Sequence, residues 1–461
     1  MFRKVQVAGL AIALGCVAVP AFAATIDDEL AALLREAPND QVISALVFLE
    51  DRVDVNELDR QLTAQRTPRQ ARHEIVVRSL QEKADAAQRE LLTYLTSRKA
   101  AGTVKDFTPF WIDNSIAVEA LPVEIRTIAG RDDVRILFYN YEIELIKPVG
   151  NPGLLPEPGG GTNAGDTTIG LEAIRAPEVW DLGFTGEGIL VATLDTGVDG
   201  NHPALASRWR GLDPRYQNNP EWAWFDPVTN TTFPQSFGSH GTHTMGTVCG
   251  GPPGEHIGVA PGAQWMHAAV IDRVNIPRTV ADAKLSFEWM LDPDGDPQTV
   301  WDVPNVCSNS WRVTSGHGYP PCDETFWEHL DNCEAAGIII LFSAGNEGPG
   351  AETIGRPPDR ATDEYRTCAV GAIDANNQNW PIASFSSRGP SHCTPDGSEA
   401  IKPEIVAPGV NVRSSIPDGG YGQSGSLFHF LTVADDPPTG ATQHDHGAQP
   451  FPNHAHHQVI L

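Results

Sequence analysis

The chain divides into two regions that differ in their pattern of hydrophobic and polar positions. In the first, short apolar runs predict strands at residues 42–49, 104–112, 115–121 and 134–145. One long segment keeps a spacing of three to four and predicts a single amphipathic helix, with its apolar positions at Val76, Leu80, Ala84, Ala87, Leu91 and Leu95. Pro122 predicts the start of a second helix and Gly130 its end. This order is typical of a small α+β module of the split β-α-β form.

The second region begins near residue 169 and alternates buried runs with helical patterns. The apolar runs lie at 189–195, 264–271, 303–310, 338–343 and 368–373, and helical patterns lie at 279–291 and 324–336. Runs that are apolar throughout are typical of a parallel sheet with helices on both faces. The predicted fold class is therefore α/β. Binding and catalytic residues of such sheets lie at the carboxyl ends of the strands.

The segment between the two regions predicts a linker over residues 148–168. It contains four prolines and a run of three glycines, without any hydrophobic period. Such a composition is flexible, exposed and open to proteolysis. The predicted organisation is an N-terminal module over 24–147 and a larger domain over 169–425.

The first 23 residues have the pattern of a secretory signal peptide. Arg3 and Lys4 precede an apolar run, and Ala21-Phe22-Ala23 forms a cleavage site of small residues. The predicted location is secreted or extracellular, or periplasmic. A lipoprotein anchor at Cys16 is the alternative, although Leu14 stands one place too late for it. No later stretch is predicted to span a membrane.

The net charge and the number of cysteines indicate which partners the chain can bind and whether it can form disulfides. A formal net charge of −27 argues against nucleic acid, because phosphate backbones select clustered lysine and arginine. Beyond Cys16 an even set of six cysteines allows up to three disulfides in an oxidising compartment, with the pairing open. Buried thiols are the alternative for Cys249 and Cys333.

Asp195 is the first candidate for catalytic chemistry. It ends an apolar run and is followed by Thr196-Gly197, so its carboxylate is expected at the carboxyl edge of the sheet. A carboxylate there can hold an imidazole in one tautomer. A helix-capping aspartate is one alternative. An aspartic protease is another, but it needs two Asp-Thr-Gly motifs in an all-β frame.

Two further segments supply an imidazole and an amide. His240 lies among small residues at a predicted loop-to-helix junction, where it is either a general base or, with His243, one of a pair of metal ligands. Asn346 directly follows an apolar run, where its amide can donate to a developing oxyanion. A simple turn former is the alternative for Asn346.

Taken together, these segments resemble the subtilisin-like serine proteases, the subtilases. The family's aspartate and histidine motifs are matched by Leu194-Asp195-Thr196-Gly197-Val198 and His240-Gly241-Thr242-His243, and its oxyanion asparagine by Asn346. Supporting matches lie at 176–180, 258–261, 309–311, 385–389 and 402–409. The resemblance covers about residues 169–425 and implies a subtilisin-like parallel sheet. The module before it is similar to the family's inhibitory, fold-assisting propeptide.

The resemblance implies a peptide-bond hydrolase that works by acyl transfer. His240 would be the general base and acid, Asp195 its orienting partner and Asn346 the oxyanion donor, with a structural role for His243. Backbone groups would bind an extended substrate along Ser308, Asn309, Ser310 and Trp311. The implied partners are protein or peptide substrates and the chain's own propeptide as an intramolecular inhibitor. Catalysis would require no cofactor.

The nucleophile motif is where the chain departs from the family. The family has Gly-Thr-Ser-Met-Ala, whereas this chain reads Gly425-Ser426-Leu427-Phe428-His429, so Leu427 stands at the nucleophile's place. Ser426 could substitute only by a slip of one residue, and its bulky neighbours would overpack a core helix. We therefore expect the chain as printed to be nearly inactive.

Residues 426–461 differ in character from everything before them. They contain no lysine, arginine or glutamate but six histidines. We favour a change of reading frame near Gly425, through a frameshift or a sequencing error, which truncates the peptidase domain. The alternative is a histidine-rich metal-binding tail. The alternative function is accordingly a non-catalytic secreted module that binds peptides or metal.

An acidic loop is the candidate metal site. Asp292, Asp294 and Asp296 alternate with Pro293 and Gly295, which resembles a calcium-binding loop. The closing glutamate of an EF-hand has no counterpart here. The interpretations are a structural calcium ion or a solvated acidic turn.

Overall fold

The computed structural model describes nine segments of the chain. They are residues 24–140, 143–146, 168–251, 256–273, 279–314, 318–363, 366–424, 432–434 and 458–460. The predicted signal peptide, nearly all of the predicted linker, Ser426 and Leu427 lie outside them. Of the helices so described, none has both the length and the apolar character needed to cross a membrane.

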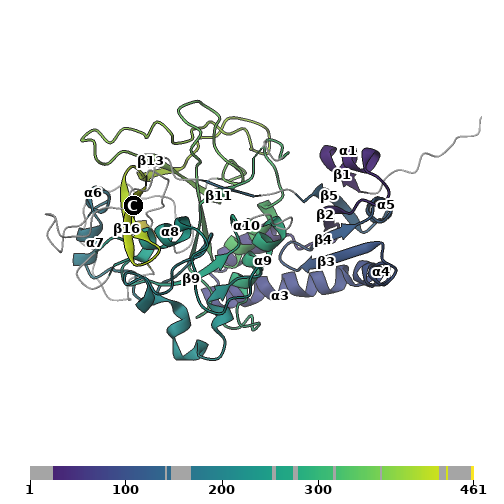
Figure 1. Cartoon of the computed structure of the whole chain (residues 1–461), viewed down its shortest axis with the longest axis horizontal. Helices are drawn as coiled ribbons and strands as arrows, with labels where there is room; N and C mark the ends of the chain where they lie inside the picture. Colours follow the sequence, from purple (N-terminus) through teal and green to yellow (C-terminus); the bar gives the residue numbers. More distant parts are fainter. Residues whose placement is uncertain are drawn as a thin grey trace, which may run out of the picture.

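The N-terminal module is a five-stranded sheet with helices, in the order β1-β5-β2-β4-β3 (Figure 1). Its strands are β1 (Thr25–Ile26), β2 (Ile43–Leu49), β3 (Val104–Phe110), β4 (Ser115–Ala120) and β5 (Val134–Tyr139). Its helices are α1 (Asp28–Glu36), α2 (Val55–Ala64), α3 (Arg69–Ala87), α4 (Arg89–Ala100) and α5 (Pro122–Ala129). The predicted α+β class of this module is confirmed.

Two predictions for this module are wrong in detail. The single long helix is two helices, α3 and α4, which meet at Gln88, and the buried amide of Gln88 donates to the carbonyl of Phe110 at 2.7 Å. The strand predicted at 134–145 ends at Tyr139, and the separate strand β6 (Glu144–Leu145) follows it. β1, α1 and α2 were not predicted from the sequence, although Asp27 and Asp54 cap the two helices through their side chains.

The larger domain is built on a seven-stranded sheet in the order β14-β13-β12-β10-β7-β9-β8, in which every neighbouring pair is parallel. The strands are β7 (Leu190–Asp195), β8 (Trp224–Phe225), β9 (Gln264–Ala269), β10 (Val306–Asn309), β12 (Ile339–Ser343), β13 (Cys368–Ile373) and β14 (Ile405–Pro408). The predicted α/β class is confirmed. The runs predicted at 264–271 and 303–310 are longer than the strands that form there.

Helices and short hairpins complete the domain. The helices are α6 (Ile169–Ala173), α7 (Ala176–Asp181), α8 (Ser239–Cys249), α9 (Thr279–Leu291) and α10 (Trp327–Ala335), with 3-10 turns η1 (Ala206–Arg208), η2 (Arg210–Leu212), η3 (Pro214–Tyr216) and η4 (Pro220–Trp222). The other strands are β11 (Trp311–Arg312), β15 (Val412–Ile416), β16 (Gly420–Ser424), β17 (Thr432–Ala434) and β18 (Gln458–Ile460). The helix predicted at 324–336 begins three residues later, at Trp327.

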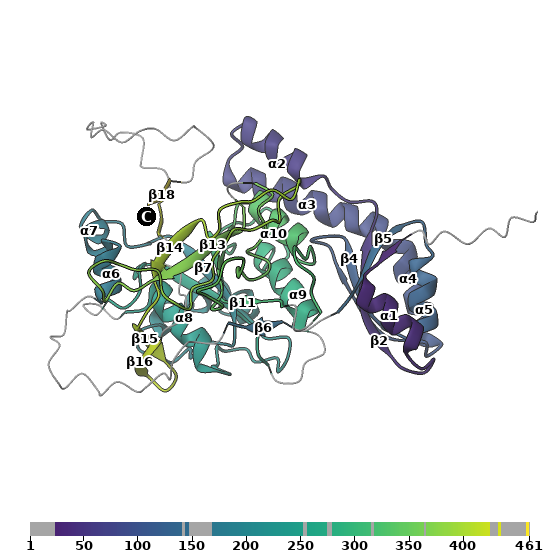
Figure 2. The same ribbon diagram turned by 90° about the horizontal axis from the view of Figure 1, so that it is seen from above.

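One hydrophobic core joins the two parts. Phe48, Val76 and Phe110 of the N-terminal module belong to the same buried cluster as Phe287 and Leu330 of the larger domain. Figures 1 and 2 show α3 running beside α10, and the hairpin of β3 and β4 points toward α9 and α10. A separate cluster fills the space between the small sheet and its own helices. The N-terminal module is therefore docked on α9 and α10 through apolar surface.

Candidate active site

Asp195 and His240 meet at the carboxyl end of β7. Asp195 is the last residue of that strand, His240 is the second residue of α8, and both are buried. The Nδ1 atom of His240 lies 2.8 Å from each carboxylate oxygen of Asp195. The amide of Thr196 also donates to Asp195, at 2.7 Å. The carboxylate can thus hold the imidazole in one orientation and stabilise its protonated form.

The electrostatics of Asp195 agree with that arrangement. Burial by itself would raise the pKa of Asp195, but the His240 imidazole and the Thr196 amide outweigh it and lower the pKa below its usual value. The group is therefore a carboxylate at neutral pH. A buried carboxylate facing an imidazole is what a general base needs as its partner.

Two glycines explain how α8 comes so close to the Asp195 turn. A Cβ atom on Gly241 would lie 2.3 Å from the carbonyl oxygen of Gly197, far inside van der Waals contact. Gly197 itself has φ +105°, a conformation that residues with a side chain rarely adopt. The amide of Gly241 donates to Thr196 Oγ1 at 3.0 Å, which fixes the helix against the turn. The small residues around His240 and after Asp195 therefore permit α8 to pack closely against the Asp195 turn.

A second buried histidine supports the same turn. The amide of Gly197 donates to Nε2 of His267 at 3.1 Å, so Nδ1 carries the proton and donates to Thr193 Oγ1 at 2.6 Å. Burial lowers the pKa of His267 to about 4, which keeps the ring neutral at neutral pH. His267 was not among the residues predicted from the sequence. Its signal was a histidine in the middle of the otherwise apolar run 265–269 of β9.

His243 lies one turn after His240 and is also buried. Burial lowers the pKa of His243 to about 3, and the neighbouring His240 adds to the effect. Among the described residues, one group of three side chains of metal-binding types lies within 4.8 Å, and it consists of Asp359 with Cys322 and Cys393, which are bonded to each other as a disulfide. Neither His240 nor His243 belongs to it, so the described geometry adds nothing to the interpretation as a metal pair.

Asn346 stands on the turn that follows β12 and is half-buried. Its backbone amide donates to Glu347 Oε2 at 3.0 Å. The same carboxylate oxygen accepts from Ser387 Oγ at 3.1 Å and pairs with Arg312 of β11. Glu347 therefore ties the Asn346 turn to the strand that the sequence analysis assigned to substrate.

The strand β11, which was predicted to bind substrate, is already paired with a strand of the N-terminal module. β11 pairs antiparallel with β6, so that Trp311 faces Leu145, and the amide of Ile146 donates to the carbonyl of Ser310 at 3.1 Å. Ser308 and Asn309 lie inside the main sheet, because β10 is bonded to β7 on one side and β12 on the other. Their backbones are therefore not an open edge, and the edge begins at Ser310.

The cysteines form one disulfide within the part of the chain that the structure describes. Cys322 and Cys393 are bonded, across 71 positions of sequence. Cys249, Cys307 and Cys333 are buried thiols, and Cys368 is a half-buried thiol. The buried-thiol interpretation of Cys249 and Cys333 is confirmed, and the other two disulfides allowed by the sequence are not formed.

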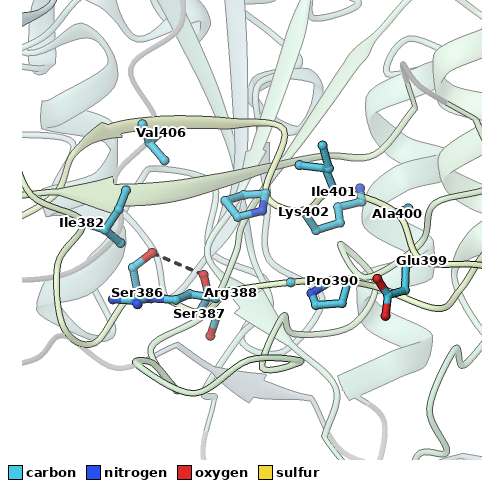
Figure 3. Close-up of a pocket in the computed structure, with 12 residues that line it drawn as sticks. Ile382, Ser386, Ser387, Arg388, Pro390, Glu399, Ala400, Ile401, Lys402 and Val406 are labelled. Carbon is cyan, nitrogen blue, oxygen red and sulfur yellow. Dashed lines mark hydrogen bonds between the residues drawn. The ribbon is translucent and has the colours of Figure 1, made fainter.

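A cavity of about 510 Å³ lies beside the edge strand β14. Figure 3 shows Ile382 and Val406 at one end of it and Ile401 at the other, with Ser386 donating to the carbonyl of Ser387 between them. Ser387 also bonds Glu347, so the cavity adjoins the Asn346 turn. It is lined mainly by apolar side chains and contains neither Asp195 nor His240, so it is distinct from the candidate catalytic pair.

Comparison with known proteins gives a consistent result. The model of the subtilase family matches residues 186–447, which include Asp195, His240 and Asn346. Bacillopeptidase F of Bacillus subtilis is 35% identical over 394 residues, which is 81% of this chain and 26% of that protein. Subtilisin E of the same organism is 29% identical over 259 residues, 55% of each chain.

A solved structure supports the fold. Fervidolysin from Fervidobacterium pennivorans, described as a keratinolytic enzyme related to subtilisin, matches with a TM-score of 0.51 at 19% identity, over 95% of this chain and 54% of that one. The chain thus spans about a quarter of bacillopeptidase F and about half of subtilisin E and of fervidolysin. At this level of identity, the structural likeness shows the shared fold alone.

Proposed function

The chain belongs to the subtilase family of serine proteases, and on that premise we propose that it is the precursor of a secreted endopeptidase, held inactive by its own N-terminal module. The observation that carries the proposal is the contact of 2.8 Å between His240 and Asp195 at the carboxyl end of β7. Secretion is inferred from the pattern of residues 1–23.

The proposed chemistry is acyl transfer with His240 as general base. A serine hydroxyl beside the imidazole would pass its proton to His240 as it attacks the scissile carbonyl, and Asp195 would stabilise the imidazolium that forms. The amide of Asn346 would donate to the oxyanion, an interaction worth about 10²–10³ in turnover. His240 would then give that proton to the amine as the C–N bond breaks, which leaves the acyl group on the serine. A water molecule deprotonated by His240 would attack the acyl ester, and the proton would return to the serine oxygen as the acid departs.

The proposed inhibitor is the N-terminal module. Its strand β6 pairs with β11 as an extended substrate would, and Ile146 continues the pairing to Ser310. Cleavage after this strand, in the predicted linker at 148–168, would leave a product-like segment in the groove. The N-terminal module would then inhibit the mature domain until it dissociates or is degraded.

The chain as printed is proposed to lack its nucleophile. Leu427 stands at the family's serine position, and removing the serine from such a triad costs about 10⁶ in turnover. The direct test is labelling of the full chain by a fluorophosphonate probe, followed by mapping of the labelled peptide, with His240→Ala and Ser426→Ala as controls. We expect no labelling that depends on His240. Labelling of Ser426 that disappears in His240→Ala would refute the proposed inactivity.

Resequencing of the locus tests the proposed change of frame. A Gly-Thr-Ser-Met motif in another frame after Gly425 would restore the complete enzyme, and we expect to find it. A clean open frame as printed would instead favour a non-catalytic peptide-binding module, which would use the same edge of β11. Binding of extended peptides by a chain that resists the fluorophosphonate would then distinguish that role.

A further inference from the structure

His267 is a fully buried histidine for which the proposed acyl transfer has no use so far. Both of its ring nitrogens are engaged: Nε2 accepts from the amide of Gly197 at 3.1 Å, and Nδ1 donates to Thr193 Oγ1 at 2.6 Å. With both nitrogens in hydrogen bonds, the ring keeps no lone pair for a metal ion. Its partners belong instead to β7 and to the turn that follows Asp195, which directs attention to the catalytic pair.

The place of the imidazole is set by the sheet. β9 lies between β7 and β8, and His267 stands level with Thr193 of β7 and with Trp224 of β8. The Trp224 ring stacks on the imidazole, with the ring centroids 5.5 Å apart and the planes inclined by 21°. Trp224 is held in turn, because its Nε1 donates to Thr231 Oγ1 at 3.0 Å. The imidazole is therefore fixed from both neighbouring strands.

The bond to His267 holds one side of the peptide that joins Thr196 to Gly197. The N–H of this peptide donates to His267, and its carbonyl accepts from the amide of Phe237 at 3.1 Å. The preceding amide, that of Thr196, donates to Asp195 Oδ1 at 2.7 Å. A peptide held from both sides therefore fixes the donor that faces the Asp195 carboxylate.

The same turn also locates α8. The amide of Gly241 donates to Thr196 Oγ1 at 3.0 Å, and that hydroxyl donates to the carbonyl of Gly238 at 3.1 Å. Gly238 caps α8, and His240 is the second residue of the helix. A displaced Thr196 would therefore shift His240 relative to Asp195. Misplacement of a catalytic group by about 1 Å can cost about 10²-fold in rate.

We propose that His267 is a positioning residue for the pair of Asp195 and His240 and acts through the amide of Gly197. The role rests on the proposed acyl transfer, in which His240 is the general base. It requires an acceptor at the place of Nε2, because a buried amide without an acceptor is unfavourable and the turn would relax to find another one. Burial lowers the pKa of His267 to about 4, so the ring is neutral and Nε2 can accept at neutral pH.

Two amide variants separate this acceptor from the rest of the ring. In His267→Gln the side-chain oxygen can lie near the place of Nε2, whereas the shorter side chain of His267→Asn reaches only the place of Nδ1. Both variants remove the ring and its stacking on Trp224, so both should lower stability. Only His267→Gln should keep an acceptor for the amide of Gly197.

Hydrogen exchange of the Gly197 amide, followed by NMR in the full chain, tests the contact itself. Exchange should be faster by about tenfold or more in His267→Asn but should stay within about threefold of the parent in His267→Gln. Equal exchange rates in the two variants would overturn the role assigned to Nε2.

The Nδ1 proton resonance of His240, assigned by its loss in His240→Ala, tests the positioning. The bond to Asp195 should place this resonance downfield in the parent, and it should move upfield in His267→Asn but not in His267→Gln. Leu95→Ala is the control for lost stability alone, because Leu95 lies in the separate core of the N-terminal module, and its resonance should match the parent's. A shift in Leu95→Ala as large as that in His267→Asn would overturn the proposal.

The same spectra separate this proposal from the proposed function. Equal His240 resonances in His267→Asn and His267→Gln would refute the role of His267 and leave the catalytic pair in place. A parent without any downfield His240 resonance would refute both, because the bond between His240 and Asp195 carries the proposed function. Neither readout requires a nucleophile, so the absence of the serine does not affect the test.

Discussion

Lys284 of α9 and Asp113 of the N-terminal module form an ion pair 2.8 Å long in which neither side chain has exposed surface. The Lys284 ammonium also donates to Ser115 Oγ at 3.0 Å and lies 4.2 Å from the centre of the Phe48 ring. A buried pair of this kind gains little over an apolar pair, but breaking it leaves one charge buried and alone. The pair therefore makes docking of the N-terminal module specific more than it makes it strong.

Truncating one partner of this pair should be costly. Lys284→Met should lower the free energy of unfolding of the full chain by about 3–5 kcal/mol, because Asp113 stays buried without its cation. The double variant Lys284→Met with Asp113→Asn should recover part of that loss. Urea unfolding measures both. A double variant no more stable than Lys284→Met would contradict this account.

A surface pair on the same module serves as the control. Lys99 and Asp106 lie 2.7 Å apart with side chains 50% and 42% exposed. Water and salt screen such a pair, so Lys99→Met should change the free energy of unfolding by less than about 1 kcal/mol. A loss as large as that of Lys284→Met would mean that burial is not the cause.

Docking of the N-terminal module should weaken as pH rises. Burial raises the pKa of Glu288 to about 8, and the charge of Asp113 raises it further, whereas the amide of Ile112, which donates at 2.9 Å, lowers it. The protonated form is favoured in the docked state. Its contribution is full below the ordinary pKa, about 4.3, and is lost as pH rises through about 8.

The matched variant for this pH dependence is Glu288→Gln, which keeps the shape of the side chain without the titration. Stability of the full chain, measured by urea unfolding between pH 5 and 9, should fall with pH less steeply in the variant than in the parent. Comparing the two slopes removes the contributions of other buried acids such as Glu334 and Asp359. Identical slopes would show that Glu288 does not carry the effect.

The sheet and the ends of its strands were predictable, because each strand is marked by a local run of apolar residues. β7, β12 and β13 are short apolar runs; Asp195 is the last residue of β7, and Asn346 lies on the turn that follows β12. Parallel strands end at the same edge, so these residues were expected near each other. The break of the long helix at Gln88 was not predictable, because it depends on a buried bond to Phe110.

The roles of the buried polar residues could not be predicted from the sequence either, because they too depend on contacts between distant parts of the chain. Lys284 and Glu288 stand four apart on α9, a spacing normally typical of a solvated helix face. They are buried because the N-terminal module covers them. Ser115 of that module, which accepts a hydrogen bond from Lys284, lies 169 positions before it in the sequence. His267 likewise acquires its role from Thr193 and Gly197, which lie far away in the sequence.

The disulfide should stabilise the larger domain considerably. Cys322 and Cys393 close a loop across 71 positions, for which the chain-entropy model gives about 4 kcal/mol. Replacing both with serine should lower the free energy of unfolding by about that amount, as measured by urea unfolding. Reduction of the parent by dithiothreitol should give a similar loss. A loss below about 1 kcal/mol would indicate that the unfolded chain is already restrained in this region.

Gly241 should be irreplaceable in the candidate active site. In Gly241→Ala the new methyl group would meet the carbonyl oxygen of Gly197 at 2.3 Å, and its three nearest atoms all belong to the Gly197 backbone, so α8 must move away from the Asp195 turn. We expect a loss of about 1–3 kcal/mol and a weaker bond between His240 and Asp195, visible as a changed downfield proton resonance of His240 Nδ1. Gly350→Ala is the control, because its nearest neighbour is a side-chain carbon of Thr353 at 3.5 Å. The interpretation fails if both variants keep the parent's stability and His240 resonance.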